Sequence, residues 1–365
     1  MEKTSGKKSA QNIRVGIPQP PNVNPGILKK RRNNNLNEID VNEYVAGILE
    51  GNRTLLSRAI TLTESSLPNH YELAQEVVER CLPHSRKSIR VGITGVPGAG
   101  KSTFIGNFGL HIVGEGRNLA VLAVDPSSEK TKGSILGDKT RMEQLCKHPN
   151  VYIRPSPAAG TMGGVARKTR ETIILCEAAG FNTILIETVG VGQSETSVHS
   201  MVDCFLLLML AGAGDELQGI KRGIMEMADI IAITKADGSN MISAELAKVT
   251  FQNALQLFPP QPSGWSPRVL TCSAKMNTGV AELWELIKQY IKFTKETGYF
   301  KELRKQQAVI RMHDTILEYL NNSFYNHEKV RLLRPLMEQQ LHDGTITSYK
   351  AALNLLDNYF KTDSE

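Results

Sequence analysis

The sequence lacks the residue clusters that hold transition metals or build disulfide frameworks. Its five cysteines form no C-x-x-C pair, are widely separated and mostly lie in apolar segments: Cys81, Cys146, Cys176, Cys204 and Cys272. The eight histidines are equally dispersed. We therefore expect free thiols in a reducing compartment and no zinc-type site.

Long hydrophobic runs are also missing. The longest, Phe205–Leu210 extended by Ala211–Ala213, falls well short of the roughly 20 apolar residues that span a bilayer. Residues 1–35 are basic and poor in acids, as a mitochondrial transit peptide would be, but the Pro- and Asn-rich stretch 18–37 lacks an amphipathic helical pattern. We expect a cytoplasmic protein without a membrane partner, beginning with a disordered tail.

Excess positive charge is concentrated in that tail. The formal net charge is +6, and residues 1–40 hold eight Lys or Arg residues against three acidic ones. The rest of the chain is therefore close to neutral. Because a nucleic-acid groove needs its positive charge within the folded part, we expect no nucleic-acid partner.

One glycine-rich stretch stands out, Gly95–Ser102, with the sequence GVPGAGKS. It fits the phosphate-binding pattern G-x-x-x-x-G-K-[ST], and it has the required context, the apolar run Ile89–Thr94 before it and a helical stretch after it. Glycines let backbone N–H groups surround phosphate oxygens, the helix N-terminus adds partial positive charge, and Lys101 adds a full one. The Ser102 hydroxyl is a candidate Mg²⁺ ligand. The stretch predicts nucleotide binding.

Strand-like runs alternate with helical stretches beyond this loop, which predicts an α/β fold with a doubly wound, mainly parallel sheet. Several runs are apolar almost throughout, as suits strands covered on both faces. The expected strands are Ile89–Thr94, Leu119–Val124, Val151–Arg154, Thr183–Ile186, Cys204–Leu210, Ile230–Thr234 and Arg268–Thr271. The expected helices are Lys101–Val113, Gly164–Ala179, Glu216–Met227, Ser243–Leu257 and Val280–Thr294.

Acidic residues follow two of these strands. Asp125 and Glu187 each come where an open parallel sheet holds its ligand, so both are candidate Mg²⁺ ligands, although a lone Asp after a strand is otherwise a helix cap. Gly190 and Gly192 would let the loop after Glu187 move when the γ-phosphate leaves. Gln193 either orients the attacking water or is a solvated loop residue.

The last two strands deliver TKAD at Thr234–Asp237 and SAK at Ser273–Lys275. The Asp237 carboxylate can accept from both the N1 and N2 protons of guanine, a pairing that adenine cannot make. The Lys235 stem would lie along the purine ring, and the backbone N–H of Ala274 would meet guanine O6. These loops predict GTP as the nucleotide. The candidate nucleotide-binding residues are Gly98, Ala99, Gly100, Lys101, Ser102, Thr103, Thr234, Lys235, Asp237, Ser273, Ala274 and Lys275.

Helical segments flank this core on both sides. We expect a disordered basic tail (1–39), an N-terminal helical extension (40–87), a P-loop GTPase domain (88–297) and a C-terminal helical dimerisation arm (298–365). The arm carries an apolar stripe, which must be buried either on the same chain or on a second copy. The stripe consists of Ile310, Ile316, Leu317, Leu320 and Phe324.

These motifs together resemble the metallochaperone-type class of P-loop GTPases, in which a glutamate stands in the position of Glu187, and within it the MeaB/ArgK (MMAA-like) family. The resemblance covers about residues 40–360. It rests on Tyr44–Leu49, Arg58–Thr61, Gly95–Ser102, Asp125–Ser128, Gly133–Met142, Arg154–Pro157, Gly163–Glu171, Glu187–Glu195 and Gly214–Lys221.

The resemblance implies a GTP-gated chaperone of adenosylcobalamin-dependent methylmalonyl-CoA mutase, with low intrinsic GTPase activity and a homodimer built with the arm. It implies three mobile segments, at about 125–142, 187–200 and 214–221. It puts Asp138 near Mg²⁺ and lets Lys221 pair with Glu187 in one switch state. The implied catalytic residues are Lys101, Asp138, Glu187, Gln193 and Lys221, and the implied metal ligands are Ser102, Asp125, Asp138 and Glu187.

Thr234 departs from the family, which usually has Asn there. A Thr hydroxyl replaces only part of the hydrogen bonding of an amide, so we expect weaker guanine binding, while Asp237 keeps the selectivity.

Three other functions compete with this interpretation. A nickel metallochaperone of the same class predicts a His-rich tract or a Cys/His cluster, and the sequence has neither. A small-molecule kinase or transport-linked ATPase needs an acceptor pocket and must tolerate ATP. A scaffold without turnover predicts that Lys101→Ala leaves every cellular function intact. We favour a Mg²⁺-dependent GTPase whose hydrolysis is a timing signal.

Overall fold

The computed structural model describes residues 39–65, 67–124, 142–155, 162–188, 194–212 and 222–360. The chain divides into Met1–Asp40 and Val41–Glu365, and the fold below belongs to the second unit. Apart from Ile39, the predicted tail lies outside the described residues. The same holds for four predicted site residues: Asp125, Asp138, Gln193 and Lys221.

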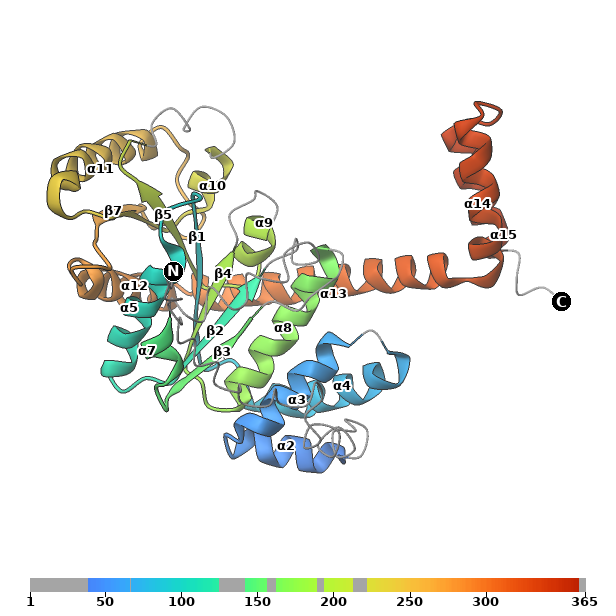
Figure 1. Ribbon diagram of the computed structural model, residues 1–365, viewed down its shortest axis with the longest axis horizontal. Helices are drawn as coiled ribbons and strands as arrows, with labels where there is room; N and C mark the ends of the chain where they lie inside the picture. The colour runs from blue at the N-terminus through green and yellow to red at the C-terminus, as the bar shows by residue number, and fades with distance from the viewer. Residues whose placement is uncertain are drawn as a thin grey trace, which may run out of the picture. The chain divides into compact units, whose positions relative to one another are not determined.

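In the described part of the chain, seven parallel strands form one sheet in the order β3-β2-β4-β1-β5-β6-β7 (Figure 1). They are β1 (Ile89–Gly95), β2 (Leu119–Val124), β3 (Val151–Arg154), β4 (Thr183–Thr188), β5 (Cys204–Leu210), β6 (Ile230–Thr234) and β7 (Arg268–Thr271). The predicted fold class is confirmed, and every strand pair in this sheet is parallel. Five strands begin and end where predicted, while β1 and β4 extend one and two residues further.

The strand order reverses beside β1. The chain steps outward from β1 to β2 and β3, returns to β4, and then continues to β5 on the other side of β1. Ligands of open parallel sheets bind beyond the carboxyl ends of the strands at such a switch point. The segments that follow the strands at this edge, among them those after β1, β4, β6 and β7, can therefore form a site.

Helices cover both faces of the sheet (Figure 1). On one face, α5 (Lys101–Gly114) packs on β1, and Phe104 joins Val91 and Ile93 in the main core. Gly92 points the other way, since a side chain there would meet Val198 of α9 (Ser194–His199). The other helices around the sheet are α7 (Glu143–Cys146), α8 (Met162–Ala178), α10 (Arg222–Met227), α11 (Met241–Leu255) and α12 (Val280–Glu296).

Three helices precede the sheet in the described part of the chain, α2 (Val41–Leu49), α3 (Arg53–Glu64) and α4 (Pro68–Cys81). Asn52 caps α3 by accepting hydrogen bonds from the Thr54 and Leu55 N–H groups. All three helices pack on one another and on α8. Their apolar faces therefore cover the following layer, as predicted.

The chain ends in three helices, α13 (Tyr299–Asn326), α14 (Glu328–His342) and α15 (Ser348–Phe360). The first part of α13 packs on α12 and α8, its far end runs away from the sheet, and α14 packs on α15 (Figure 1). The predicted stripe lies largely on the exposed surface of α13, with Ile310 43% and Leu317 60% exposed. Within the described residues, the same chain leaves Ile310, Ile316, Leu317 and Leu320 exposed, while the Phe324 ring contacts that of Tyr359 in α15.

Candidate functional site

The loop after β1 has a backbone that only glycine adopts easily at two positions. Gly98 and Gly100 have φ of +83° and +79°, in the left-handed region. Gly95 lies so close to β5 that a Cβ would stand 2.4 Å from the carbonyl oxygen of Leu208. The Lys101 ammonium donates to the carbonyl of Gly95 at 3.0 Å. This is a closed loop at a helix N-terminus, the form that receives phosphate groups.

The end of β4 brings Glu187 to this loop. The buried Ser102 hydroxyl donates to the Glu187 carboxylate at 3.3 Å, and Glu187 pairs in register with Ile93 of β1. A hydroxyl and a carboxylate oxygen are the hard donors that Mg²⁺ takes, so these two residues fit that ion. The described residues contain no group of three or more His, Cys, Asp and Glu side chains that could hold a metal. A full Mg²⁺ shell would therefore need further oxygens, such as those of phosphate.

The end of β6 is tied to the phosphate-binding loop by a hydroxyl. Thr234 is 4% exposed, and its Oγ1 lies 2.9 Å from the carbonyl oxygen of Ala99 and 3.1 Å from that of Met209. The neighbouring Lys235 stem passes the loop, with Cε 3.9 Å from the place of a Cβ on Gly100. The TKAD loop and the P-loop therefore lie together, as their order in the sequence predicts.

The loops after β6 and β7 are joined to each other. The Ser273 hydroxyl donates to Asp237 Oδ2 and accepts from the Met276 N–H at 3.1 Å. Asn107 of α5 donates to the carbonyl of Ala274 at 2.5 Å. These bonds orient one carboxylate and one loop backbone beside α5, an arrangement that can read the edge of a base. The predicted residues Thr103 and Lys275 are exposed.

A buried polar chain links the end of β4 to α9, and the sequence analysis missed it. The Thr188 hydroxyl donates to Thr94 at 2.8 Å, and the Thr94 hydroxyl lies 3.4 Å from Glu195 Oε1. Ser194 also donates to the Glu195 carboxylate, at 3.2 Å. Thr188 and Ser194 flank residues 189–193, so these hydrogen bonds connect the two ends of the segment that follows Glu187. The available signal was a pair of threonines in otherwise apolar strands.

Two groups whose pKa values are shifted by burial lie at the opposite end of the sheet from the P-loop. Asp229 is buried just before β6, where burial raises its pKa to about 7, although it accepts a hydrogen bond from the Phe205 N–H at 2.8 Å. His199, at the end of α9, has its pKa lowered by burial, which favours the neutral ring. Both groups lie away from the P-loop and are structural in position.

Comparison with known proteins agrees with this geometry. The family described as "Methylmalonyl Co-A mutase-associated GTPase MeaB" matches residues 56–329. GTPase ArgK of Escherichia coli is 44% identical over 300 residues, covering 82% of this chain and 91% of its own. The mouse protein named methylmalonic aciduria type A homolog, mitochondrial, is 43% identical over 332 residues, covering 88% and 80% respectively.

A solved structure agrees at the level of the whole fold. The crystal structure of a protein named LAO/AO transport system kinase is 34% identical, has a TM-score of 0.68 and covers 87% of this chain and 96% of its own. The part of the chain that the structure describes contains no helix long and apolar enough to cross a membrane. The P-loop, the Glu187 contact and these relatives lead to one assignment: the chain belongs to the MeaB family and is a P-loop GTPase that binds guanine nucleotide.

Proposed function

We propose that this GTPase is a GTP-gated chaperone of adenosylcobalamin-dependent methylmalonyl-CoA mutase, acting in the loading and protection of its cofactor. The family description, which names that mutase, supports the partner. The observation that carries the switch is the Ser102–Glu187 contact, because it joins the P-loop to the strand end that precedes residues 189–193. A change at the γ-phosphate would reach that segment directly.

The phosphate end of the site works with Mg²⁺ in this proposal. Lys101 binds and neutralises the β- and γ-phosphates, and Ser102 and Glu187 hold the ion. Asp125 and Asp138, which lie outside the described residues, supply the remaining carboxylate oxygens. Mg²⁺ would neutralise charge on the phosphates, and the chain positions them.

The base end reads guanine in this proposal. Asp237 accepts from the base, and Ser273 holds that carboxylate through its hydroxyl. The Asn107 bond keeps the Ala274 backbone beside α5, where its N–H meets guanine O6. Thr234 stands where the family usually has Asn, and its hydroxyl tethers this loop to the Ala99 carbonyl.

The signal passes through Glu187 and the buried threonine chain to α9. In the other switch state Lys221 pairs with the carboxylate of Glu187, and Gln193 orients the attacking water. Both residues lie outside the described ranges and remain proposals. The low intrinsic rate follows if contact with the mutase must position Gln193 before water can attack.

The arm builds a homodimer in this proposal. The exposed apolar side chains of α13 continue onto α14 and α15, where Leu332 is 70% and Tyr349 75% exposed. Extended apolar faces of this kind mark an interaction surface, and a second copy would bury them symmetrically. The division into tail (1–39), helical extension (40–87), GTPase domain (88–297) and arm (298–365) belongs to the same proposal.

The test is GTP hydrolysis with and without methylmalonyl-CoA mutase from the same organism, with ATP as the control nucleotide. We expect slow GTP turnover alone, faster turnover and co-elution with the mutase, and no ATP turnover. Lys101→Ala serves as the matched inactive variant, because it removes the phosphate-binding ammonium and leaves the apolar core intact.

The outcomes separate the alternatives. If the mutase changes nothing and does not co-elute, the chaperone role fails while the GTPase activity remains. Equal turnover of ATP would instead revive a kinase or transport-linked ATPase, in line with the name of the related protein of known structure, LAO/AO transport system kinase.

A further inference from the structure

A second polar site lies at the opposite end of β1 from the P-loop. A cavity of about 80 Å³ opens between α8, α13 and the turn that precedes β1. Arginines from separate parts of the chain line it: Arg86, Arg90, Arg170, Arg304 and Arg311. Five guanidinium groups around so small a space need negative charge nearby.

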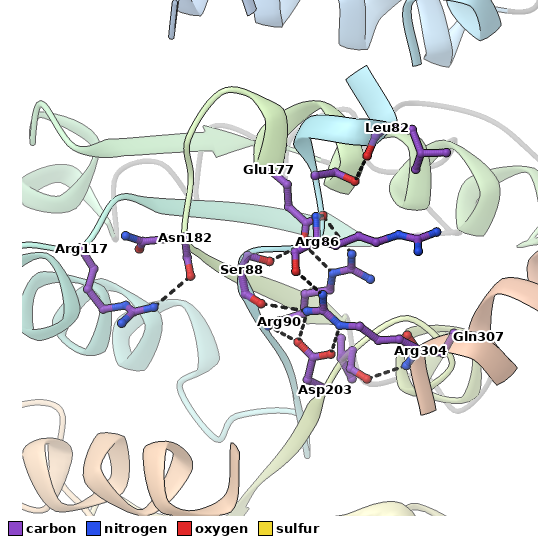
Figure 2. A network of polar contacts seen from close by, with 12 residues as sticks. Leu82, Arg86, Ser88, Arg90, Arg117, Glu177, Asn182, Asp203, Arg304 and Gln307 are labelled. Atoms are coloured by element: carbon purple, nitrogen blue, oxygen red, sulfur yellow. Dashed lines mark hydrogen bonds and ion pairs between the residues drawn. The ribbon is translucent and has the colours of Figure 1, made fainter. Parts of the chain in front are cut away.

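Buried carboxylates hold two of these arginines in place (Figure 2). Arg90 donates to both oxygens of Glu177, at 2.9 and 3.0 Å, and the Glu177 side chain is fully buried. Arg304 of α13 donates to both oxygens of Asp203 at 2.8 Å and to the carbonyls of Arg86 and Ser88. Within each pair, the guanidinium and the carboxylate satisfy each other's charge. The two arginines are thereby fixed where they line the cavity.

The other three arginines are incompletely matched. Arg170 donates to Asp314 at 2.6 Å and to Ser200 at 2.7 Å. Its Nε finds no hydrogen-bond partner within the described ranges, although the residue is only 7% exposed. Among the described residues, the Arg311 side chain makes no hydrogen bond or ion pair, and its charge is compensated by a longer-range attraction to Glu171. That carboxylate is already bonded by Arg167 and Gln75.

Two more lining residues add polar groups to this arginine cage, whereas the apolar part of the lining consists of Leu82, Ile173, Ile174, Met201 and Ala308. Arg86 adds a fifth cationic side chain, which is exposed. Its backbone has a φ of +72°, its N–H donates to Glu177, and its carbonyl accepts from Arg304. Gln307 donates to the Val202 carbonyl at 2.7 Å, while its buried Oε1 has no hydrogen-bond partner in the part of the chain that the structure describes. The cage therefore offers several N–H donors and one acceptor, which suits an oxyanion that carries a proton.

We propose that this cavity binds a phosphate-class oxyanion through Arg311, Arg86 and the Nε of Arg170. Its volume of about 80 Å³ is well above the roughly 10–15 Å³ that a single water needs, so one phosphate group has room in it. Guanidinium groups match phosphate oxygens in pairs, and Gln307 Oε1 accepts the proton of hydrogen phosphate. The bound anion joins α8, the residue after α9 and the base of α13.

The probe is inorganic phosphate, titrated calorimetrically into the full chain saturated with Mg²⁺ and a non-hydrolysable GTP analogue. Filling the P-loop in this way removes phosphate binding there. We expect one saturable site and a melting temperature that rises with phosphate but not with sodium chloride of equal ionic strength.

Two variants and one control locate the site. Arg311→Gln weakens phosphate binding about tenfold or more, the effect of losing one charged hydrogen-bond donor. Arg86→Asn, which tolerates the left-handed backbone, weakens it too and does not disturb a buried ion pair. Lys301→Gln is the control: it removes an equal charge from an exposed position of α13, the helix that carries Arg311, and leaves phosphate binding unchanged.

Glucose 6-phosphate distinguishes the source of the group. Binding of inorganic phosphate alone assigns the cavity to the free anion, whereas equal or tighter binding of the monoester assigns it to the terminal phosphate of a larger ligand. Absence of saturable binding for both probes overturns the proposal, and so does phosphate binding by Arg311→Gln and Arg86→Asn as tight as that of the unmodified chain.

Discussion

Replacing Thr234 by Val tests whether one hydroxyl joins the base loop to the P-loop. Thr and Val have nearly the same shape, so T234V removes the hydroxyl without opening a cavity. The Ala99 carbonyl then loses its partner at 2.9 Å in a site where Thr234 is only 4% exposed. An unsatisfied buried carbonyl costs about 1–3 kcal/mol, and we expect the free energy of unfolding to fall by that amount.

The same change should weaken nucleotide binding, because Ala99 belongs to the loop that surrounds the phosphates. A loss of about 1.4 kcal/mol is a tenfold loss of affinity, so T234V should bind a fluorescent GDP analogue about tenfold more weakly. Thr234→Ser keeps the hydroxyl and should retain most of the affinity. Thr234→Asn supplies an amide donor, as the family does, and should bind at least as tightly as the natural sequence.

Urea unfolding and GDP titration are the two assays for these variants. The reasoning is refuted if T234V unfolds at the same urea concentration and binds GDP as tightly as the unmodified chain. It is also refuted if T234S loses as much affinity as T234V, since the methyl group and not the hydroxyl would then matter.

Three further changes probe other parts of the molecule. Asp237→Asn exchanges an acceptor for a donor at the base, so the binding free energy of GTP should weaken by about 1–3 kcal/mol while xanthosine triphosphate binds more tightly. Competition binding measures both affinities, and an unchanged preference for GTP would contradict this role. Arg304→Ala leaves the fully buried Asp203 side chain without its cation and should cost about 3–5 kcal/mol in urea unfolding, whereas a loss below 1 kcal/mol would contradict the network. Asp229 has a pKa of about 7 in the folded chain against 3.8 ordinarily, so the folded state holds a proton that the unfolded state has lost between these values. Unfolding free energy should therefore fall by up to about 4 kcal/mol as pH rises from 4 to 7 and level off above; Asp229→Asn should flatten this profile.

The strands were the most predictable elements, for a physical reason. A strand covered by helices on both faces must be apolar nearly throughout, and β5 and β6 are buried over almost their whole length. Turn residues then mark both ends. The helices of the arm were harder, because the break at His327 between α13 and α14 carries no glycine or proline. Its extended backbone depends on packing that no local pattern encodes.

The site was predictable where a loop motif carries the chemistry and hidden where distant residues meet. GKS and TKAD have fixed spacing, so Lys101 and Thr234 could be named in advance. The arginine cavity could not, because Arg90 and Arg304 are far apart in sequence and meet only after α13 docks on the start of β1. No spacing rule connects them, and an arginine on a helix usually indicates a solvated face.

The two sides of the nucleotide site differ in how they are fastened, and this difference bears on signalling. On the base side, Thr234 reaches the P-loop carbonyl of Ala99 and Asn107 reaches Ala274, so base loop, P-loop and α5 form one tethered unit. On the other side, the Ser102 hydroxyl donates to Glu187 at 3.3 Å, and the end of β4 continues through Thr188 and Thr94 to Glu195 of α9. This side therefore connects the P-loop to the strand end that precedes residues 189–193. In the function proposed above, the base side fixes which nucleotide binds, and the β4 side transmits whether its γ-phosphate is present, because only the β4 side leads from the P-loop to α9.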